Sequence, residues 1–599
     1  MSTEPREQTV DFAGRDGFEP GWFGDPERPL LGWYLPPRHH ARGCGVVLCP
    51  PFGHEYLVCY RSYRHLAGHL ANAGFAVFCF DYDATGDSAG EGGDPGRVAA
   101  WQRSIVAAMA QLRVCSGVAE VALFGVRLGG LLAASVAVTE PCAALMLLAP
   151  VASGRAYARE LSAWRGMNPL TPAQDPTRVV GADEVVGYPF SDETRADLGR
   201  MDLSTIAELC CRRALVIARD QLAGGERRLA AAWTTLGLDV DLSLTDGYAA
   251  MMRDDAYDAV SPEAIWAEVT SWLSQRFPVQ PAVAATPLNW SRSAVMQEGS
   301  ATLREEVVTF GPLAGILTEP AQPSAGSLPA VILTNVGANH RVANHRLYVT
   351  LARDLAAKGF TVLRFDRAGM GDSQVAPGGK ENDVYASVGI DNVRAAMDFL
   401  GRVRGHQRFV LGGLCSGAYF SFHAAAIDPR AVGLVMINIL TFKWKEGDSL
   451  EVARRQSIKA TGFYLRSSLS SSTWRRALTG DVNVALILLK LSGRIVRRSG
   501  TIARGWLARL LRLDPPLSKA AMQFRSMLGR GTEIMMIFGS DDAGIDLMHQ
   551  HLGRDGYLIG HSSLFRLAIV DGVDHTFTPR WSQRYLRDMV SAHLIDRFK

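Results

Sequence analysis

The segment FVLGGLCSGAYFSFHAAA, residues 409–426, decides the fold of the second half of this chain. Its first five residues are apolar or small and predict a buried strand, and YFSFHAAA predicts a helix. Between them, Gly413 and Gly417 lie two residues before and two residues after Cys415. This spacing is typical of a nucleophile on a strained strand-to-helix turn, where only small flanking residues let the strand and the helix pack closely. The dipole of the following helix also favours a thiolate at its N terminus.

The same turn has other interpretations. Cys415 is either a nucleophile or a buried structural cysteine that follows a strand. Ser416 is a weaker nucleophile, because centring the motif on it puts Leu414 where a small residue is required. If Cys415 is the nucleophile, the backbone N–H of Ser416 forms one half of an oxyanion hole.

Partners for a nucleophile follow later in the chain. In folds with this turn the order is nucleophile, acid and histidine. The apolar run EIMMIFG, residues 533–539, ends in a glycine, and the usual acid position three residues later is Asp542, with Asp541 as the alternative. After the last apolar run comes His575, which we predict as the general base, although a surface loop histidine is the alternative. In this triad His575 deprotonates Cys415 and Asp542 fixes the imidazole tautomer.

The loop after the apolar run 330–334 supplies the second oxyanion donor in this prediction. The backbone N–H of Gly337 or Ala338 is the best candidate. Polar residues follow in the same loop, and they either bind a substrate carboxylate or phosphate or simply stabilise the loop. These predicted substrate-binding residues are Asn339, His340 and Arg341, with Arg346 shortly after them.

Two segments of the chain are alike. RSYRHLAGHLANAGFAVFCFDYDATGDSAG begins at Arg61, and HRLYVTLARDLAAKGFTVLRFDRAGMGDSQ begins at His345. Each predicts an amphipathic helix, a strand and a turn ending in Gly-Asp-Ser. The turn residues Asp87 and Asp372 are 285 residues apart, and the glycine after each helix keeps the same spacing. We infer that a whole domain has been duplicated.

Each copy alternates short apolar β-branched runs with amphipathic helices. This pattern predicts an α/β fold with a mostly parallel sheet flanked by helices on both faces. A chain of 599 residues is too long for one core, so two tandem domains are expected. We predict a first domain over residues 1–275, a Pro- and Ala-rich linker over 276–297 and a second domain over 298–599.

The first copy has lost the catalytic residue types. Arg127 occupies the nucleophile position of its turn, GVRLG, and arginine stays protonated. The region matching the terminal histidine, residues 244–251, has no histidine, and Asp220 remains as a carboxylate available to pair with Arg127. Arg127 therefore binds an anionic ligand or forms a structural ion pair, and we predict a non-catalytic domain with a scaffold or binding role.

Together these motifs resemble the α/β-hydrolase superfamily, and the helix-to-GDS segments resemble its serine aminopeptidase-like branch. The paired turns GVRLG and GLCSGA, at 125–129 and 413–418, are similar to those of paired hydrolases encoded beside exosortase systems, here fused in one chain. The resemblance implies two tandem α/β-hydrolase folds and an acyl-enzyme mechanism with no metal and no organic cofactor. The departure from the family pattern is the cysteine at the nucleophile position, which argues against a simple esterase.

A basic insertion interrupts the second copy. Residues 441–530 hold 18 Lys and Arg against 5 Asp and Glu, a net charge of +13, and 484–513 alternates apolar and basic residues at helical spacing. A helical lid at about 442–530 is the expected structure, because lids of the resembled fold enter here. The basic face is solvated, or docks an acidic acyl carrier protein, or lies on an anionic membrane surface.

The composition limits the classes of function. The net charge of +3 argues against nucleic acid as a partner. The first residues carry no apolar signal core, and no apolar stretch reaches about 18 residues, so neither export nor a spanning helix is expected. Nine cysteines without zinc or disulfide spacing indicate reduced thiols and a cytoplasmic protein.

These observations predict an enzyme that accepts an acyl group on Cys415 as a thioester. A thioester reacts well with amines and carbanions, which favours an acyltransferase or cyclase, while a thioesterase or esterase remains an alternative. A non-catalytic scaffold or ligand-binding protein built from two degenerate domains is the hypothesis from another class. A peptidase is a third hypothesis and rests on the branch resemblance alone.

Overall fold

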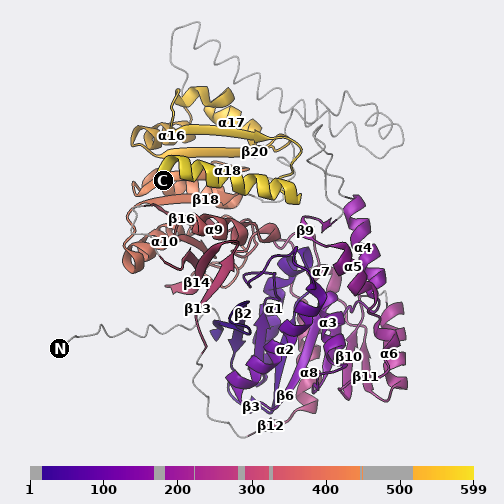
Figure 1. The fold of residues 1–599 in the computed structure, drawn as a ribbon. Helices are drawn as coiled ribbons and strands as arrows, with labels where there is room; N and C mark the ends of the chain where they lie inside the picture. Colours follow the sequence, from indigo (N-terminus) through magenta and orange to yellow (C-terminus); the bar gives the residue numbers. More distant parts are fainter. Residues whose placement is uncertain are drawn as a thin grey trace, which may run out of the picture.

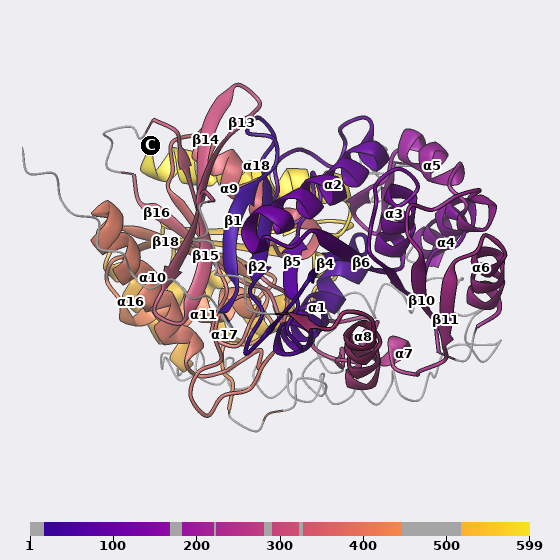
Figure 2. The ribbon, with the colours of Figure 1, turned by 90° about the horizontal axis from the view of Figure 1, so that it is seen from below.

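The computed structural model describes residues 17–167, 183–220, 223–280, 290–322, 328–445, 448 and 517–599. Each half of the chain forms its own sheet with helices on both faces (Figure 1). The first half, coloured indigo to magenta, and the second half, coloured red to yellow, lie side by side when seen from below (Figure 2). The expected tandem of two α/β folds is therefore confirmed.

The first sheet has eight strands in the order β1-β2-β5-β4-β6-β7-β10-β11. The first two pairings are antiparallel and the remaining five are parallel. The strands are β1 (Glu19–Phe23), β2 (Leu30–Leu35), β4 (Cys44–Cys49), β5 (Ala76–Phe80), β6 (Glu120–Val126), β7 (Leu145–Leu148), β10 (Arg213–Ile217) and β11 (Asp239–Ser243). Both faces of the central strand β4 are buried, as expected for a parallel sheet covered by helices.

The second sheet repeats this plan with nine strands in the order β13-β14-β15-β17-β16-β18-β19-β20-β21. Its antiparallel edge comprises β13, β14 and β15, and the rest of the sheet is parallel. The strands are β13 (Ser293–Glu298), β14 (Ala301–Phe310), β15 (Leu313–Pro320), β16 (Ala330–Thr334), β17 (Val362–Phe365), β18 (Phe409–Leu414), β19 (Ala431–Ile437), β20 (Glu533–Gly539) and β21 (Phe565–Val570).

Helices cover both faces of each sheet. In the first half they are α1 (His54–Asn72), α2 (Arg97–Ser116), α3 (Leu128–Val136), α4 (Gly154–Met167), α5 (Asp192–Gly199), α6 (Gly224–Thr235), α7 (Tyr248–Met251) and α8 (Glu263–Arg276). In the second half they are α9 (Leu347–Ala357), α10 (Gly389–Arg404), α11 (Ser416–Ile427), α16 (Lys519–Gly529), α17 (Gly544–Leu552) and α18 (Arg580–Phe598). None of the helices within the described ranges is long and apolar enough to cross a membrane.

A shared tyrosine bridge supports the duplication. In the first domain the hydroxyl of Tyr63, on α1, donates to the carbonyl of Cys49 at 2.8 Å. The same hydroxyl accepts the backbone N–H of Val126, the last residue of β6 before the sharp turn. In the second domain the hydroxyl of Tyr348, on α9, donates to the carbonyl of Thr334 at 3.1 Å and accepts the backbone N–H of Leu414, the last residue of β18. The two tyrosines keep the spacing of the sequence repeat, so each copy fastens its turn in the same way.

The two domains meet through their Gly-Asp-Ser turns. Asp372 of the second domain accepts hydrogen bonds from three side chains of the first, at 3.0 Å from Trp33 Nε1, 2.7 Å from Tyr60 and 2.5 Å from Arg64. Asp87 of the first domain is fully buried against two arginines of the second, Arg341 and Arg364. Each turn aspartate is thus held by the neighbouring domain.

The expected linker is shorter than 276–297 at both ends. A short strand, β12 (Val279–Gln280), pairs with β3 (Ala41–Arg42) of the first domain, and β13 already belongs to the second sheet. Most of the expected lid at 442–530, including the basic stretch 484–513, lies outside the described residues. The last part of that range forms α16, which packs beside α11.

Candidate active site

The turn between β18 and α11 has the strained geometry of a nucleophile elbow. Cys415 has φ 57° and ψ −115°, a region that residues other than glycine rarely adopt. Arg127, at the matching turn between β6 and α3, has φ 53° and ψ −118°. The two copies therefore share the backbone and differ in the side chain that it presents.

The glycines of the motif are required by packing. A Cβ added at Gly417 would lie 2.2 Å from the carbonyl oxygen of Thr334, and one at Gly413 would lie 2.4 Å from the backbone of Gly417. In the first domain, a Cβ at Gly129 would lie 2.2 Å from a backbone carbonyl of β4. All three backbone contacts are too short for any side chain, which is the physical reason for the G-x-x-x-G spacing.

The predicted acid and base lie together. Asp542, in the loop after β20, is buried, and its Oδ2 lies 2.5 Å from Nδ1 of His575. Its other oxygen accepts the backbone N–H of Gly544 at 2.7 Å, which fixes the carboxylate. Asp542 therefore occupies the position of the acid, and the alternative, Asp541, does not make this contact.

The His575 imidazole interacts electrostatically with Cys415 as well as with Asp542. Burial lowers the pKa of His575, but the nearby carboxylate of Asp542 and then the sulfur of Cys415 raise it, and the net pKa lies well above the usual 6.5. The buried Nε2 has no hydrogen-bond partner of good geometry among the described residues. Such bonds are often poorly aligned before substrate binds. His575 thus interacts with Asp542 on one side and with Cys415 on the other, as the predicted triad requires.

Sequence reasoning missed Asn438, which follows β19 and joins the two loops of the pair. Its Nδ2 donates to the carbonyl of His575 at 2.7 Å, and its Oδ1 accepts from the backbone N–H of Gly539 at 2.9 Å. Asn438 has φ 45°, a conformation that asparagine tolerates better than most residues. The signal in the sequence was an asparagine directly after an apolar strand.

The oxyanion donors are arranged differently from the prediction. The N–H of Gly337 donates to the Oγ of Ser416 at 2.8 Å, so it is occupied. The N–H of Ser416 is at the first position of α11, where no intrahelical partner exists. Ala338 makes no backbone N–H hydrogen bond within the described part of the chain. Ser416 and Ala338 therefore remain available as donors, and Gly337 becomes available only when Ser416 rotates.

Two of the three predicted substrate-binding residues belong to the domain interface. Arg341 is buried, and its guanidinium reaches Asp87, Asp366 and Asp372 at 2.8–2.9 Å. His340 is buried and stacks on Tyr60 of the first domain, with ring centroids 4.0 Å apart. Both side chains contact the first domain, and Arg341 also pairs with two aspartates of its own domain. Their polar groups are therefore engaged within the protein, which corrects the expectation that they bind substrate.

Asn339 also has a structural partner, because its Nδ2 donates to Asn344 at 2.9 Å. Arg346 reaches across the interface and donates to four backbone carbonyls of the first domain, those of Ala84, Gly86, Ser88 and Gly90. The loop-stabilising alternative thus describes this segment better than substrate binding does.

An aromatic group lies beside Cys415 and was also missed. Tyr385 stacks on Trp444 with centroids 4.2 Å apart and meets Tyr419 edge-on at 5.2 Å. Burial raises the pKa of Tyr385, and an electrostatic interaction with Cys415 raises it further. Arg367 is buried beneath the oxyanion loop and donates to the carbonyl of Gly337 at 3.2 Å.

The matching site of the first domain is filled by an ion cluster. Arg127 Nε lies 3.0 Å from Glu55, and its Nη2 lies 2.6 Å from Glu160. Asp220 does not pair with Arg127, and it instead accepts the backbone N–H groups of 247–249 at 2.8–3.0 Å. Of the two alternatives for Arg127, the structure has the ion pair.

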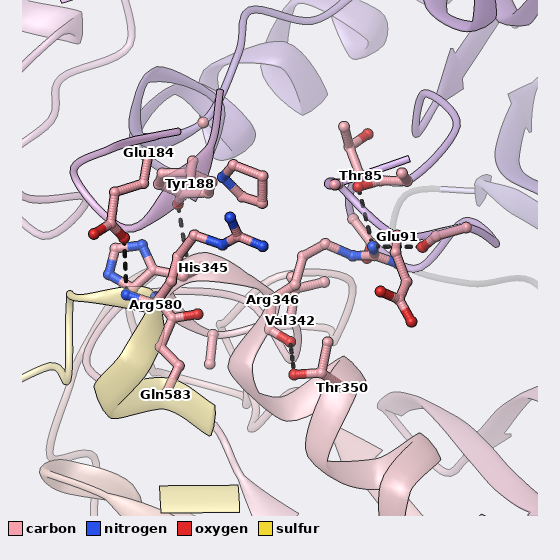
Figure 3. Close-up of a pocket in the computed structure, with 18 of the residues that line it drawn as sticks. Thr85, Glu91, Glu184, Tyr188, Val342, His345, Arg346, Thr350, Arg580 and Gln583 are labelled. Atoms are coloured by element: carbon pink, nitrogen blue, oxygen red, sulfur yellow. Dashed lines mark hydrogen bonds between the residues drawn. The ribbon is translucent and has the colours of Figure 1, made fainter. Parts of the chain in front are cut away.

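A cavity of about 580 Å³ lies between the domains and does not include Cys415. Its walls come from the loops 84–93 and 183–189 of the first domain and from 342–354 and 580–587 of the second. Figure 3 shows Tyr188 and Glu184 on one side of it, facing His345 and Arg580. Among the described residues, no group of three His, Cys, Asp or Glu side chains is arranged to hold a metal.

Family comparisons agree with this geometry. Residues 51–189 match the model of the serine aminopeptidase S33 family, and residues 329–458 match the model of the alpha/beta hydrolase fold. The chain carries two tandem α/β-hydrolase folds. A hydrolase-type enzyme is the activity class that both matches support, and no protein of curated function matches the chain.

Three solved structures with similarity to this chain each align to less than half of it. Est1E from Butyrivibrio proteoclasticus is 16% identical with a TM-score of 0.32, and 98% of it aligns to 43% of this chain. Carboxyl esterase 2 from the fungus Tuber melanosporum is 15% identical with a TM-score of 0.32, and 90% of it aligns to 45% of this chain. A thermostable carboxyl esterase from Bacillus coagulans is 14% identical with a TM-score of 0.31, over 98% of it and 43% of this chain.

Proposed function

We propose that the second domain is an esterase-like acyl-transfer enzyme that uses Cys415 as its nucleophile. The observation that carries the proposal is the pair of Asp542 and His575, with Nδ1 and Oδ2 2.5 Å apart, next to a cysteine on a strained elbow. Asp542 is buried and raises the pKa of His575 against the opposing effect of desolvation, and titratable pairs perturbed in this way are concentrated at functional sites.

The proposed chemistry begins with attack on an acyl carbonyl. Nε2 of His575 takes the proton of the Cys415 thiol, and the sulfur forms a C–S bond to the acyl carbon while the π electrons of the carbonyl move onto its oxygen. The N–H groups of Ser416 and Ala338 stabilise the charge on that oxygen. The intermediate then expels the alcohol or thiol of the substrate, which takes a proton from Nε2 of His575. Asp542 holds the imidazole tautomer throughout. The product of this half-reaction is a thioester on Cys415.

The second half-reaction transfers the acyl group. Water, an amine or another nucleophile attacks the thioester, gives its proton to His575 and breaks the C–S bond. Because thioesters react readily with amines and carbanions, transfer or cyclisation is favoured over simple hydrolysis. An acidic acyl carrier protein docking on the basic insertion 441–530 is the proposed source of acyl groups, and its charge complementarity predicts inhibition by salt.

The test is mass spectrometry of the full chain treated with p-nitrophenyl acetate. We expect an acetyl adduct on Cys415 that is absent from Cys415→Ala. Cys210→Ala is the matched control, because Cys210 is an exposed thiol of the first domain and its loss should leave the adduct unchanged. The same adduct on Cys415→Ala would contradict the proposal.

The non-catalytic scaffold is the competing hypothesis, and thiol alkylation separates the two. If Cys415 and His575 form a reactive pair, iodoacetamide should label Cys415 faster in the natural protein than in His575→Ala, by roughly tenfold or more at neutral pH. Equal labelling rates in both proteins would favour the scaffold.

A further inference from the structure

A short hairpin of the first domain lies against the turn that carries His575. The hairpin consists of β8 (Glu184–Val185) and β9 (Tyr188–Pro189), and Figure 1 shows β9 at the boundary with the second domain. Gln583, on α18, donates to the carbonyl of Gly187 at 3.1 Å and to the carbonyl of Thr578 at 2.7 Å. One side chain thus ties the hairpin to the segment that follows His575.

The tip of the hairpin is shaped for this approach. Val186 has φ 46° and Gly187 has φ 79°, as in the tight two-residue turns that connect hairpin strands. A Cβ added at Gly187 would lie 2.2 Å from the carbonyl oxygen of Thr578. The backbones of the two domains therefore touch at a point where no side chain fits.

Glu184 caps a helix of the other domain. The helix α18 begins at Arg580, and its N-cap residue is Pro579, which provides no side-chain hydrogen bond. The carboxylate of Glu184 accepts the backbone N–H of Arg580 at 2.8 Å, and Glu184 is only 2% exposed (Figure 3). A buried carboxylate at a helix N terminus satisfies a free N–H and complements the helix dipole.

The turn between His575 and α18 is short and stiff. The N–H of Thr578 donates to Asp574 at 2.7 Å, and its hydroxyl donates to the same carboxylate at 2.6 Å. Phe577 is fully buried with φ 54°, a strained conformation that the surrounding packing must maintain. A displacement of the start of α18 is therefore transmitted to the imidazole instead of being absorbed in a flexible loop.

The hairpin also touches the oxyanion side of the site. The hydroxyl of Tyr188 accepts the N–H of His345 at 3.5 Å, and the two rings meet at 4.8 Å. His345 belongs to a segment that follows the oxyanion loop, and Ala343, His345 and Arg346 all have positive φ. The hairpin thus contacts two segments of the second domain, one that follows His575 and one that follows the oxyanion loop.

We propose that the hairpin 183–190 of the degenerate domain positions His575 in the catalytic domain, with Glu184 and Gly187 as positioning residues. This inference rests on the proposed function, since it assigns a role relative to His575. It gives the first domain a task that its own filled pocket does not provide. The contact is intramolecular, so it is present in every copy of the full chain.

The test compares variants of the full chain in p-nitrophenyl acetate hydrolysis and in iodoacetamide labelling of Cys415. We expect Glu184→Ala to lower kcat by roughly tenfold with little change in KM, because a small misplacement of a catalytic base has effects of this size. The pH profile of the labelling rate should shift in the same variant. Glu184→Gln keeps an acceptor for the Arg580 N–H and should restore kcat to within about twofold.

Asp183→Ala is the matched control, because Asp183 lies in the same hairpin and its exposed carboxylate pairs with the partly buried side chain of Arg580. It should leave kcat and the pH profile unchanged. Gly187→Ala is the second variant, since it pushes on Thr578 without removing the cap, and it should lower kcat even if Glu184→Ala does not fold. Unchanged kcat in folded Glu184→Ala, or in Gly187→Ala, would overturn the inference.

The same experiment separates the two proposals. If His575→Ala labels and hydrolyses like the natural protein, the proposed function itself fails. If His575→Ala is impaired while the hairpin variants are not, only the positioning role fails.

Discussion

At the scale of single residues, the candidate site pairs a partly buried imidazole with a buried carboxylate. Burial alone would lower the pKa of His575, yet the carboxylate of Asp542 and the sulfur of Cys415 raise it well above 6.5. The imidazolium is therefore favoured near neutral pH, where it can donate a proton to a leaving group. Asn438 hydrogen-bonds both the loop that carries His575 and the loop that carries Asp542. A conservative substitution of Asn438 therefore tests whether these loops need to be held together.

We expect Asn438→Asp to lower kcat while leaving the protein folded. An aspartate keeps the acceptor for the N–H of Gly539 but cannot donate to the carbonyl of His575. The loss of one buried donor should destabilise the fold by about 1–3 kcal/mol. Ester hydrolysis and urea unfolding measure the two effects, and an unchanged kcat would show that the His575 loop does not need this bond.

At the scale of elements, the strand-to-helix elbow explains why the two copies diverged where they did. Backbone contacts demand glycine on both sides of the turn, and they make no demand on the residue between. Cys415 and Arg127 consequently occupy the same strained backbone position, one as a thiol that can act as a nucleophile and the other as a permanent cation. An arginine at this place needs counter-charges, and Glu55 and Glu160 supply them in the first domain.

Gly417→Ala and Gly129→Ala form a matched pair of tests. Each added Cβ would lie 2.2 Å from a backbone carbonyl, so each should destabilise its domain by about 1–3 kcal/mol or more. Only Gly417→Ala should also reduce ester hydrolysis and labelling of Cys415. Thermal unfolding and kinetics on both variants check this, and equal losses of activity would mean that the first domain carries chemistry of its own.

At the scale of the whole molecule, the domains are joined by buried charges. Arg341 and Arg364 hold Asp87, and the arginines lower its pKa to about 2 against the opposing effect of burial. Burial raises the pKa of Asp366 to about 6, despite the nearby Arg341. Removing one partner from such a cluster leaves an unpaired buried charge, so the interface has little tolerance for substitution.

The interface also predicts a pH dependence. Burial, and then the charge of Arg341, lowers the pKa of His340 to about 4. The unfolded chain therefore binds a proton that the folded protein does not between about pH 4 and 6.5, so stability from this group rises with pH in that interval. His340→Phe keeps the stacking on Tyr60 and cannot titrate.

We expect the free energy of unfolding of the natural protein to rise by roughly 2 kcal/mol more than that of His340→Phe between pH 4.5 and 6.5. Asp81 and Asp366, whose pKa values burial raises to about 7 and 6, act with the opposite sign, but they are common to both proteins. Urea unfolding at three pH values measures the difference. Parallel pH curves would contradict the buried neutral state of His340.

The sequence by itself determined the duplication, the two parallel sheets and the elbow. These features depend on local periodicity and on close backbone approach, which Gly413 and Gly417 record directly in the chain. The spacing of three residues after Gly539 predicted Asp542 ahead of Asp541, and Asp542 is the carboxylate that contacts His575. Family matches to both halves agree with this part of the interpretation.

Only the tertiary structure decided what the polar loop residues bind. His340 and Arg341 follow a strand as substrate-binding residues would, yet the first domain covers them and provides Tyr60 and Asp87 as partners. Likewise, nothing local in the sequence connects Glu184 to Arg580, because 396 residues separate them. Partners of buried charges are fixed by which surfaces meet in three dimensions, and that depends on the packing of both domains.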